Sequence, residues 1–132
     1  MAWWRGDDRA HGNPKLLAVG LDGIGLFWQA VSWSSAHGTD GFVPEYVVPS
    51  LAPGVAPKVL TAIVRRLTVV SPGQENPLWH VDDDGYRIHD FLDLNPSASE
   101  VEAAREQRRE AGRVGGSRSA AKRAASAGRK QT

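Results

Sequence analysis

Apolar residues recur at helical spacing in two long stretches of this chain and in one short stretch. Residues 22–38 show the strongest pattern, because apolar side chains return every three or four positions and a glycine follows the run. Residues 57–67 begin with Pro57, which suits the first position of a helix, and their apolar side chains share one face. A shorter helix is predicted within residues 13–20, with Asn13 as its N-cap.

The helical pattern is broken between the two long helices. A turn signal at residues 40–41 precedes a short extended segment at residues 42–43. Residues 44–51 leave room only for a brief helix, because Pro49 limits it. The predicted order up to residue 67 is therefore helix, extended segment, short helix and helix.

The stretch LWHVDDDGYRIHDF, residues 78–91, fits a two-stranded hairpin. Its Asp-Gly pair at 84–85 is a strong signal for a type I′ turn. With that turn, Asp82 faces Arg87 across the hairpin and forms a charge pair on the outer side. The inner side is predicted to hold Trp79, Val81, Tyr86 and Ile88.

The histidines and aspartates of residues 78–91 also suggest a metal or catalytic site. The same register places His80 opposite His89, with Asp82 diagonal to them. A metal site needs three or four convergent ligands, whereas this side of the hairpin is expected to be exposed. The sequence also lacks the nucleophile-elbow, zinc-helix, phosphate-loop and dinucleotide-binding motifs. We therefore expect no metal, no cofactor and no enzymatic activity.

The C-terminal third predicts a projecting helix and a disordered tail. Residues 97–112 combine a capping box with i,i+3 Glu–Arg pairs but have almost no apolar face. Residues 113–132 are rich in Gly, Ser and Ala, contain no acid, and are expected to be disordered without a partner. With a folded domain at residues 1–96, these two segments complete the predicted organisation.

The net charge of +1 hides an asymmetry. Residues 1–100 hold seven Lys/Arg and twelve Asp/Glu, whereas residues 101–132 hold nine Lys/Arg and three Glu. Such a split points to a nucleic-acid or other anionic partner for the basic end, and a solubilising tail is the alternative.

The composition excludes several classes of protein. The chain contains no cysteine, which excludes disulfides, thiol nucleophiles and Cys-based zinc sites. No window approaches the roughly 18 apolar residues that a membrane helix needs. Residues 1–14 lack the apolar run of a signal peptide, so a soluble protein without membrane contact is expected.

The predicted order of helix, extended segment, short helix, helix and hairpin is that of a winged helix-turn-helix domain. In this fold the helix before the hairpin enters the DNA major groove, and the hairpin, or wing, lies along the backbone or minor groove. Arg can recognise guanine edges and Lys can neutralise phosphate, although an ordinary solvated helix face has the same composition. The candidate DNA contacts are Lys58, Thr61, Arg65 and Arg66 on the helix, His80, Arg87 and His89 on the wing, and Arg113, Arg118, Lys122, Arg123, Arg129 and Lys130 in the tail.

Four stretches resemble a family of small actinobacterial and actinobacteriophage proteins. They are MAWWRGDD, HGNPKLLAVG, IGLFWQAVSWSSAHGTDGFVP and GYRIHDFLDLNPSASEVEAAREQRREAGRVGG. Family members share a W-[FW]-x-x-D-D start, an H-x-x-P-K segment, a G-L-[WF]-x-x-x-x-S-W-[SA] helix ending in T-D-G-F-V-P, and a closing H-D-[WF]-x-x-[YN]-x-P-S-x-x-E motif. The resemblance spans about residues 2–116.

This resemblance implies a winged-helix DNA-binding protein, similar to phage replication initiators or replisome organisers and to the DNA-binding end of DnaD-like helicase loaders. It places the turn at residues 39–44, the recognition helix at 57–67 and the wing at 79–89. The chain departs from the family pattern between residues 68 and 79, where the family reaches the wing more quickly.

The sequence therefore predicts a protein of phage or prophage type that binds double-stranded DNA in the cytoplasm of a bacterial host, associated with the nucleoid. Its expected role is replication initiation or replisome organisation. A transcriptional regulator with the same winged helix is an alternative. A protein-interaction module that docks a helicase or a host factor is another, and the acidic balance of residues 1–100 suits it.

Overall fold

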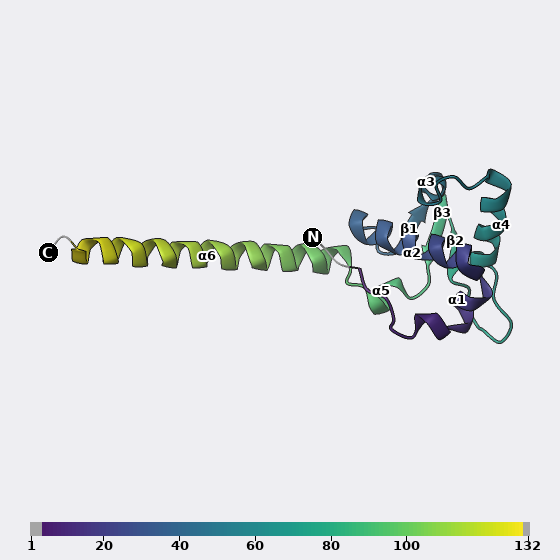
Figure 1. The fold of residues 1–132 in the computed structure, drawn as a ribbon, viewed down its shortest axis with the longest axis horizontal. Coiled ribbons are helices and arrows are strands. Elements are labelled where there is room, and N and C mark those ends of the chain that lie inside the picture. Colours follow the sequence, from purple (N-terminus) through teal and green to yellow (C-terminus); the bar gives the residue numbers. More distant parts are fainter. Residues whose placement is uncertain (1–3, 131–132) are drawn as a thin grey trace. The chain divides into compact units, whose positions relative to one another are not determined.

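The computed structural model describes the backbone of residues 4–130 and the side chains of residues 4–126. Residues 1–98 and residues 99–132 form two compact units, and we call the first the N-terminal unit. The elements in chain order are η1 (Ala10–Gly12), α1 (Pro14–Ala18), α2 (Gly20–His37), β1 (Phe42–Pro44), η2 (Glu45–Val47), α3 (Val48–Leu51), α4 (Pro57–Thr68), β2 (Trp79–Asp82), β3 (Gly85–Ile88), α5 (Phe91–Leu94) and α6 (Ala98–Lys130) (Figure 1).

Helices α1, α2 and α4 form where the sequence predicts them, whereas η1 and α5 were not predicted. The Asn13 side chain accepts a hydrogen bond of 2.9 Å from the Lys15 N–H and so caps α1, as predicted. Gly38 adopts a left-handed φ of 65° and ends α2. Pro57 occupies the first turn of α4, which ends at Thr68, close to the predicted boundary.

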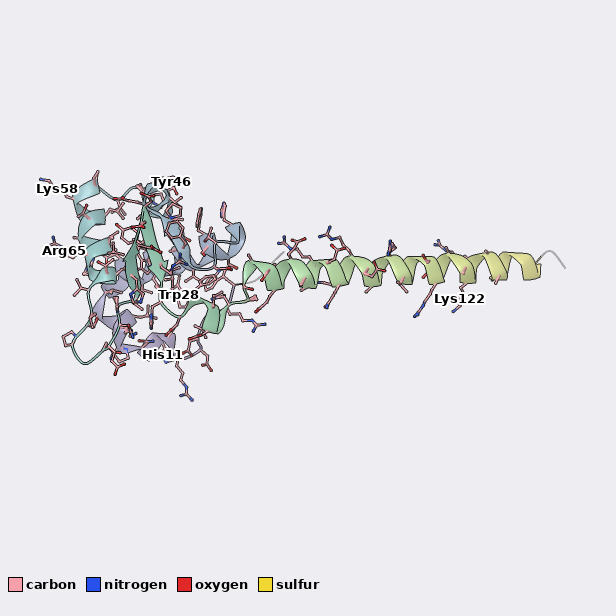
Figure 2. The ribbon with its side chains drawn as sticks, turned by 180° about the vertical axis from the view of Figure 1, so that it is seen from behind. His11, Trp28, Tyr46, Lys58, Arg65 and Lys122 are labelled. Atoms are coloured by element: carbon pink, nitrogen blue, oxygen red, sulfur yellow. The ribbon has the colours of Figure 1, made fainter. Side chains whose placement is uncertain are left out.

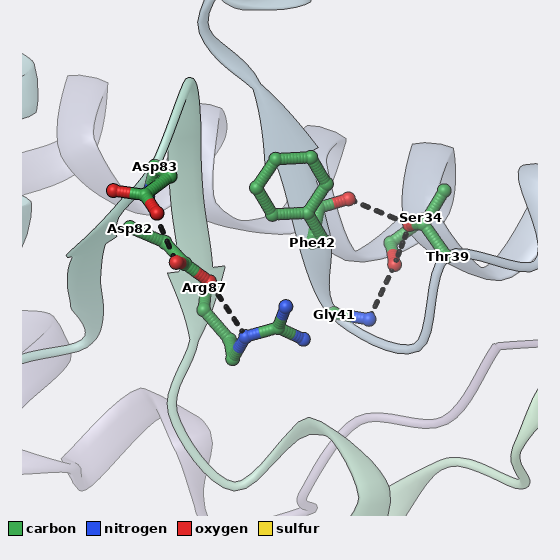
Figure 3. A network of polar contacts seen from close by, with 7 residues as sticks. All are labelled: Ser34, Thr39, Gly41, Phe42, Asp82, Asp83 and Arg87. Carbon is green, nitrogen blue, oxygen red and sulfur yellow. Dashed lines mark hydrogen bonds and ion pairs between the residues drawn. The ribbon is translucent and has the colours of Figure 1, made fainter.

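A network of hydrogen bonds fixes the turn between α2 and β1 (Figure 3). The buried Ser34 hydroxyl lies 2.6 Å from the Thr39 hydroxyl and accepts a hydrogen bond of 2.7 Å from the Gly41 N–H. The Thr39 hydroxyl donates in turn to the Phe42 carbonyl, at 2.6 Å. The Asp40 carboxylate, in the same turn, accepts a hydrogen bond of 2.6 Å from the backbone N–H of Ala98, the first residue of α6. The predicted turn therefore also caps a helix that begins 58 residues later.

The hairpin of β2 and β3 forms, but its turn lies one residue earlier than predicted. Asp82 lies opposite Gly85, so the two turn residues are Asp83 and Asp84. Asp84 takes the left-handed φ of 62° that the turn requires. The predicted turn at residues 84–85 is therefore wrong.

A third strand explains the position of the turn. The sheet has the order β1-β3-β2, and β1 pairs antiparallel with β3, with Pro44 opposite Gly85. A Cβ atom on Gly85 would overlap the Val43 carbonyl oxygen and come within 2.9 Å of Pro44 Cα. Gly85 is needed because β1 passes so close to it that no side chain fits. Glycine occurs in strands for this reason as well as for its left-handed conformation in turns.

The hydrophobic core lies between α2, α4 and one face of the sheet. Trp79 is completely buried in it and packs against the half-buried Tyr86, with ring centroids 5.4 Å apart. Val81 was predicted to point inward, but it is 75% exposed. Burial along β2 falls from Trp79 to Asp82, so the core covers only the base of the hairpin and leaves the tip in solvent.

The predicted disorder after residue 112 is wrong for the described part of the tail. Helix α6 continues from Ala98 to Lys130, and residues 131–132 lie outside the described residues. The Ala, Arg and Lys residues of the tail favour helix, which outweighs the cost of its glycines. All acids of α6 lie in its first half, whereas the charged residues of its second half are all cations, as the helix dipole favours. Among the described residues, no helix combines the length and the apolar character needed to cross a bilayer.

Candidate nucleic-acid interface

Helix α4 has one face in the core and one face in solvent. Ile63 and Leu67 are buried, and Leu60 and Val64 pack against the core beside them. Val59 was predicted to share this apolar face but is half exposed in the first turn. The apolar face therefore fixes the rotation of α4 about its axis, and with it the direction of the polar face.

The polar face of α4 carries cations and no acid. Lys58, Thr61 and Arg65 are exposed, and Figure 2 shows Lys58 and Arg65 directed away from the body of the N-terminal unit. The Thr61 hydroxyl donates a hydrogen bond of 3.0 Å to the Pro57 carbonyl, which leaves its oxygen able to accept another. Ala62 lies between these residues and keeps the middle of the face shallow.

Arg66, the fourth residue predicted for this face, is held by α2 instead. Its Nη1 atom donates to the Val19 carbonyl at 2.6 Å, and its Nη2 atom donates to the Asp22 carboxylate at 2.8 Å. The hydrogen bond from Arg66 is the largest influence on the pKa of Asp22, which lies below its usual value. Because both nitrogens are engaged inside the N-terminal unit, Arg66 connects α4 to the start of α2.

The tip of the hairpin is acidic. Asp82, Asp83 and Asp84 are exposed, and the Asp84 carbonyl accepts a hydrogen bond of 2.9 Å from the N–H of Glu45. The predicted ion pair forms on this hairpin, with Arg87 Nε 3.0 Å from Asp82 Oδ2 (Figure 3). The backbone N–H of Asp83 and then the Arg87 guanidinium lower the pKa of Asp82, so its carboxylate is charged at neutral pH. We call Asp82–Asp84 the acidic tip.

The two histidines of the hairpin bind each other. His80 Nε2 lies 2.9 Å from His89 Nδ1, although the shifted register places Arg87, not His89, opposite His80. His89 Nε2 lies 3.2 Å from the Asp90 carboxylate. No cluster of three or more metal-ligating His, Cys, Asp or Glu residues occurs within the described part of the chain. The imidazoles are therefore directed at each other and at Asp90, and both are partly buried.

The charges of α6 lie in two blocks. In the first, Glu102 and Glu106 bind Arg109 at 3.0 and 3.4 Å, and Glu110 binds Arg113 at 2.6 Å. Arg113, one of the predicted tail contacts, is therefore already paired with an acid.

Glu110 is the last acidic residue of the sequence, so the second block of α6, after Arg113, contains no acid. Arg118, Lys122 and Arg123 are exposed there, and none of them contacts an acidic group among the described side chains. Lys122 projects from the helix in Figure 2. The side chains of Arg129 and Lys130 lie outside the described residues.

A small groove between α3 and α4 was not predicted from the sequence. It has a volume of about 230 Å³, and its apolar floor borders the polar face of α4 at Thr61. No local sequence pattern predicts it, because its lining comes from four elements, η2, α3, α4 and β3, that only tertiary packing brings together. The residues that line it are Glu45, Val48, Pro49, Leu60, Thr61, Val64 and Tyr86.

Comparisons of the chain with protein-family models, with curated proteins and with solved structures gave no match. The resemblance to the actinobacteriophage helix-turn-helix family, and the DNA-binding role that it implies, therefore stay predictions.

Proposed function

We propose that this protein is a winged-helix DNA-binding protein with α4 as its recognition helix and the β2–β3 hairpin as its wing. The observation that carries the proposal is the exposed, acid-free face of α4 with Lys58, Thr61 and Arg65. A helix in the major groove recognises bases with such side chains, provided that its position is rigid. The burial of Ile63 and Leu67 supplies that rigidity.

The order of the elements supports this assignment. Helix α2, strand β1, helices α3 and α4, and strands β2 and β3 follow each other as in a winged helix. The hydrogen bonds from Arg66 to Val19 and Asp22 add a fixed connection between α4 and α2. In this proposal Arg66 positions the recognition helix, and Lys58, Thr61 and Arg65 contact DNA.

In this proposal the wing contributes less to DNA binding than α4 does. The acidic tip would repel phosphates, so a wing contact would come from the base of the hairpin, at His80, Arg87 and His89. Arg87 is already paired with Asp82 and lies 5.5 Å from the centre of the Phe42 ring, which limits its reach.

The basic half of α6 would add contacts to phosphates through counterion release. Six tail contacts would give a log–log salt slope of about −5, and the pairing of Arg113 with Glu110 reduces this to about −4.5 for five. A chain truncated after Gly112 should show a much flatter slope. An unchanged slope in that chain would remove α6 from the proposed interface.

The test of the α4 interface is fluorescence anisotropy with a duplex of mixed sequence at low and physiological salt. The double substitution Lys58→Ala and Arg65→Ala should weaken binding at least tenfold, at about 1 kcal/mol or more per lost contact. Arg5→Ala/Arg9→Ala is the matched control, since it removes two exposed cations from the same unit. Equal affinities of the double variant and the control would contradict a role of α4.

We further propose, on the resemblance, a role in replication initiation or replisome organisation of a phage or prophage inside the bacterial host cell. A footprint on the DNA molecule that encodes the protein separates this role from transcriptional regulation. Protection at a replication origin supports the first role, and protection at an operator supports the second.

A protein-interaction module is the second candidate, and the acidic tip beside the apolar groove favours it. Such a module would dock a helicase or host factor and show no duplex binding near physiological salt. A stable complex in a pull-down, together with unchanged anisotropy of the duplex, would favour this candidate over DNA binding.

A further inference from the structure

We propose that the groove between α3 and α4 docks the basic half of α6 from a second copy of this chain. Val114 of the second copy enters the groove and occupies part of it, and its Arg118 and Lys122 approach Glu45 and the acidic tip. This inference goes beyond DNA binding and does not depend on it.

The groove is large enough to accept an aliphatic side chain from a partner. Val48, Pro49, Leu60 and Val64 supply aliphatic surface, and the Tyr86 ring closes one side. Its volume of about 230 Å³ lies below the roughly 300–1,000 Å³ of pockets that hold small-molecule ligands. An aliphatic anchor from a helix is a recognised occupant of such a groove.

The edge of the groove is negative. Glu45 lines it, is exposed, and is hydrogen-bonded through its N–H to the carbonyl of Asp84 in the acidic tip. Burial raises the pKa of Tyr86, and the charge of Glu45 raises it further, which shows how close that charge lies to the groove. None of the described lining residues is cationic. A partner for this surface should therefore combine an apolar anchor with positive charge.

Helix α6 carries that combination. Val114 is the only apolar residue larger than alanine between residues 102 and 130, and it is 40% exposed. Arg118 and Lys122 follow at four-residue intervals, so they share a face with Val114. Neither cation contacts an acid among the side chains that the structure describes.

The charges of the two units are complementary as well. Residues 1–98 contain seven Lys/Arg and eleven Asp/Glu, and residues 99–132 contain nine Lys/Arg and four Glu. The groove and the α6 face are different surfaces of one chain, so their contact is heterologous and either closes into a reciprocal dimer or ring or continues from copy to copy. In each case the protein should self-associate, and the association should be salt-sensitive.

Sedimentation velocity of the full chain, without DNA, tests this. At about 50 mM salt the average mass should rise with concentration above the monomer's 14.3 kDa. At about 500 mM salt, where screening shortens the reach of charges to ~4 Å, it should return to the monomer. A monomer at low salt and high concentration would overturn the proposal.

Two sets of variants locate the contact. Val114→Asp should abolish association, whereas Ser119→Asp, which adds the same charge on another face of α6, should weaken it less. Equal effects of the two variants would contradict docking through Val114.

Charge exchange gives the sharper test. Glu45→Lys alone and the double variant Arg118→Glu/Lys122→Glu alone should each stay monomeric, and their mixture should associate again. A mixture that stays monomeric, while circular dichroism shows both chains folded, would overturn the proposal. Because no DNA is present, these results are independent of the proposed DNA binding.

Discussion

The guanidinium of Arg66 donates to the Asp22 carboxylate at 2.8 Å and joins α4 to α2 through two residues that are 44 positions apart in the sequence. The same guanidinium donates to the Val19 carbonyl, just before α2 begins. Val19 is the C-cap of α1 as well as the N-cap of α2, and the last carbonyls of a helix lack N–H partners within that helix, so a side-chain donor satisfies one of them here. Arg66 therefore stabilises the start of α2 and the position of α4 together.

Arg66→Ala should lower the stability of the N-terminal unit by about 1 kcal/mol, chiefly through loss of the bond to the Val19 carbonyl. The ion pair with Asp22 adds little, because both side chains are 40–50% exposed. Arg65→Ala is the control, since Arg65 is exposed and should leave stability unchanged. Urea titration followed by tryptophan fluorescence measures both, and equal midpoints for the two variants would contradict the structural role of Arg66.

The stability of the N-terminal unit should also depend on pH through the carboxyl group of Asp22. Its pKa is lowered from 3.8 in the folded protein, so the unfolded chain binds the proton more readily. The contribution of the Asp22 charge is complete above pH 3.8 and disappears as the pH falls through the lower folded-state pKa. Melting temperatures of the wild type and Asp22→Asn should therefore converge as the pH is lowered below 3.8, and a constant difference would contradict this.

Gly85→Ala should destabilise the sheet by about 3 kcal/mol, because the new Cβ meets the Val43 carbonyl and Pro44. Gly73→Ala is the matched control. Gly73 has a φ of 79°, and a Cβ there meets no described atom within 4 Å, so its cost is only the left-handed strain of about 1 kcal/mol. If Gly85 were the left-handed turn residue that the sequence suggests, the two substitutions would cost the same in thermal unfolding.

The role of Gly85 could not be predicted from the sequence alone, whereas the ends of the helices could. Caps and helical periodicity are local, so Asn13, Gly38 and Pro57 mark their helices correctly. The Asp-Gly pair has two physical explanations, a left-handed turn or a close approach by another strand, and only the pairing of β1 with β3 decides between them.

The candidate site was predictable to a similar extent. The acid-free face of α4 follows from the spacing of its residues, whereas the capture of Arg66 by Asp22 depends on contact between distant helices. The groove at Tyr86 and Glu45 arises in the same way, from packing that no single stretch of sequence encodes.

The helical state of the tail gives a further prediction. Gly115 and Gly116 lie inside α6, and a Cβ on either would meet no described atom within 4 Å. Replacing both by alanine should stabilise the second half of α6 by about 1 kcal/mol per site. The far-UV circular dichroism signal should then persist to higher temperature, and Ser119→Gly should have the opposite effect. If none of the three substitutions changed the temperature dependence of the circular dichroism signal, this segment would not be helical.

The acidic tip should oppose DNA binding if the hairpin is a wing. Asp83 and Asp84 are exposed, and no cation pairs with their side chains in the described structure, so their charges would act directly on nearby phosphates. Asp83→Asn/Asp84→Asn should raise duplex affinity severalfold at low salt, and the gain should shrink as salt screens it. Asp7→Asn/Asp8→Asn makes the same change in net charge at the N-terminal end and is the control. A larger gain from the tip than from the control places the hairpin near the DNA backbone, whereas equal gains would indicate only a change in overall charge and would contradict the wing assignment.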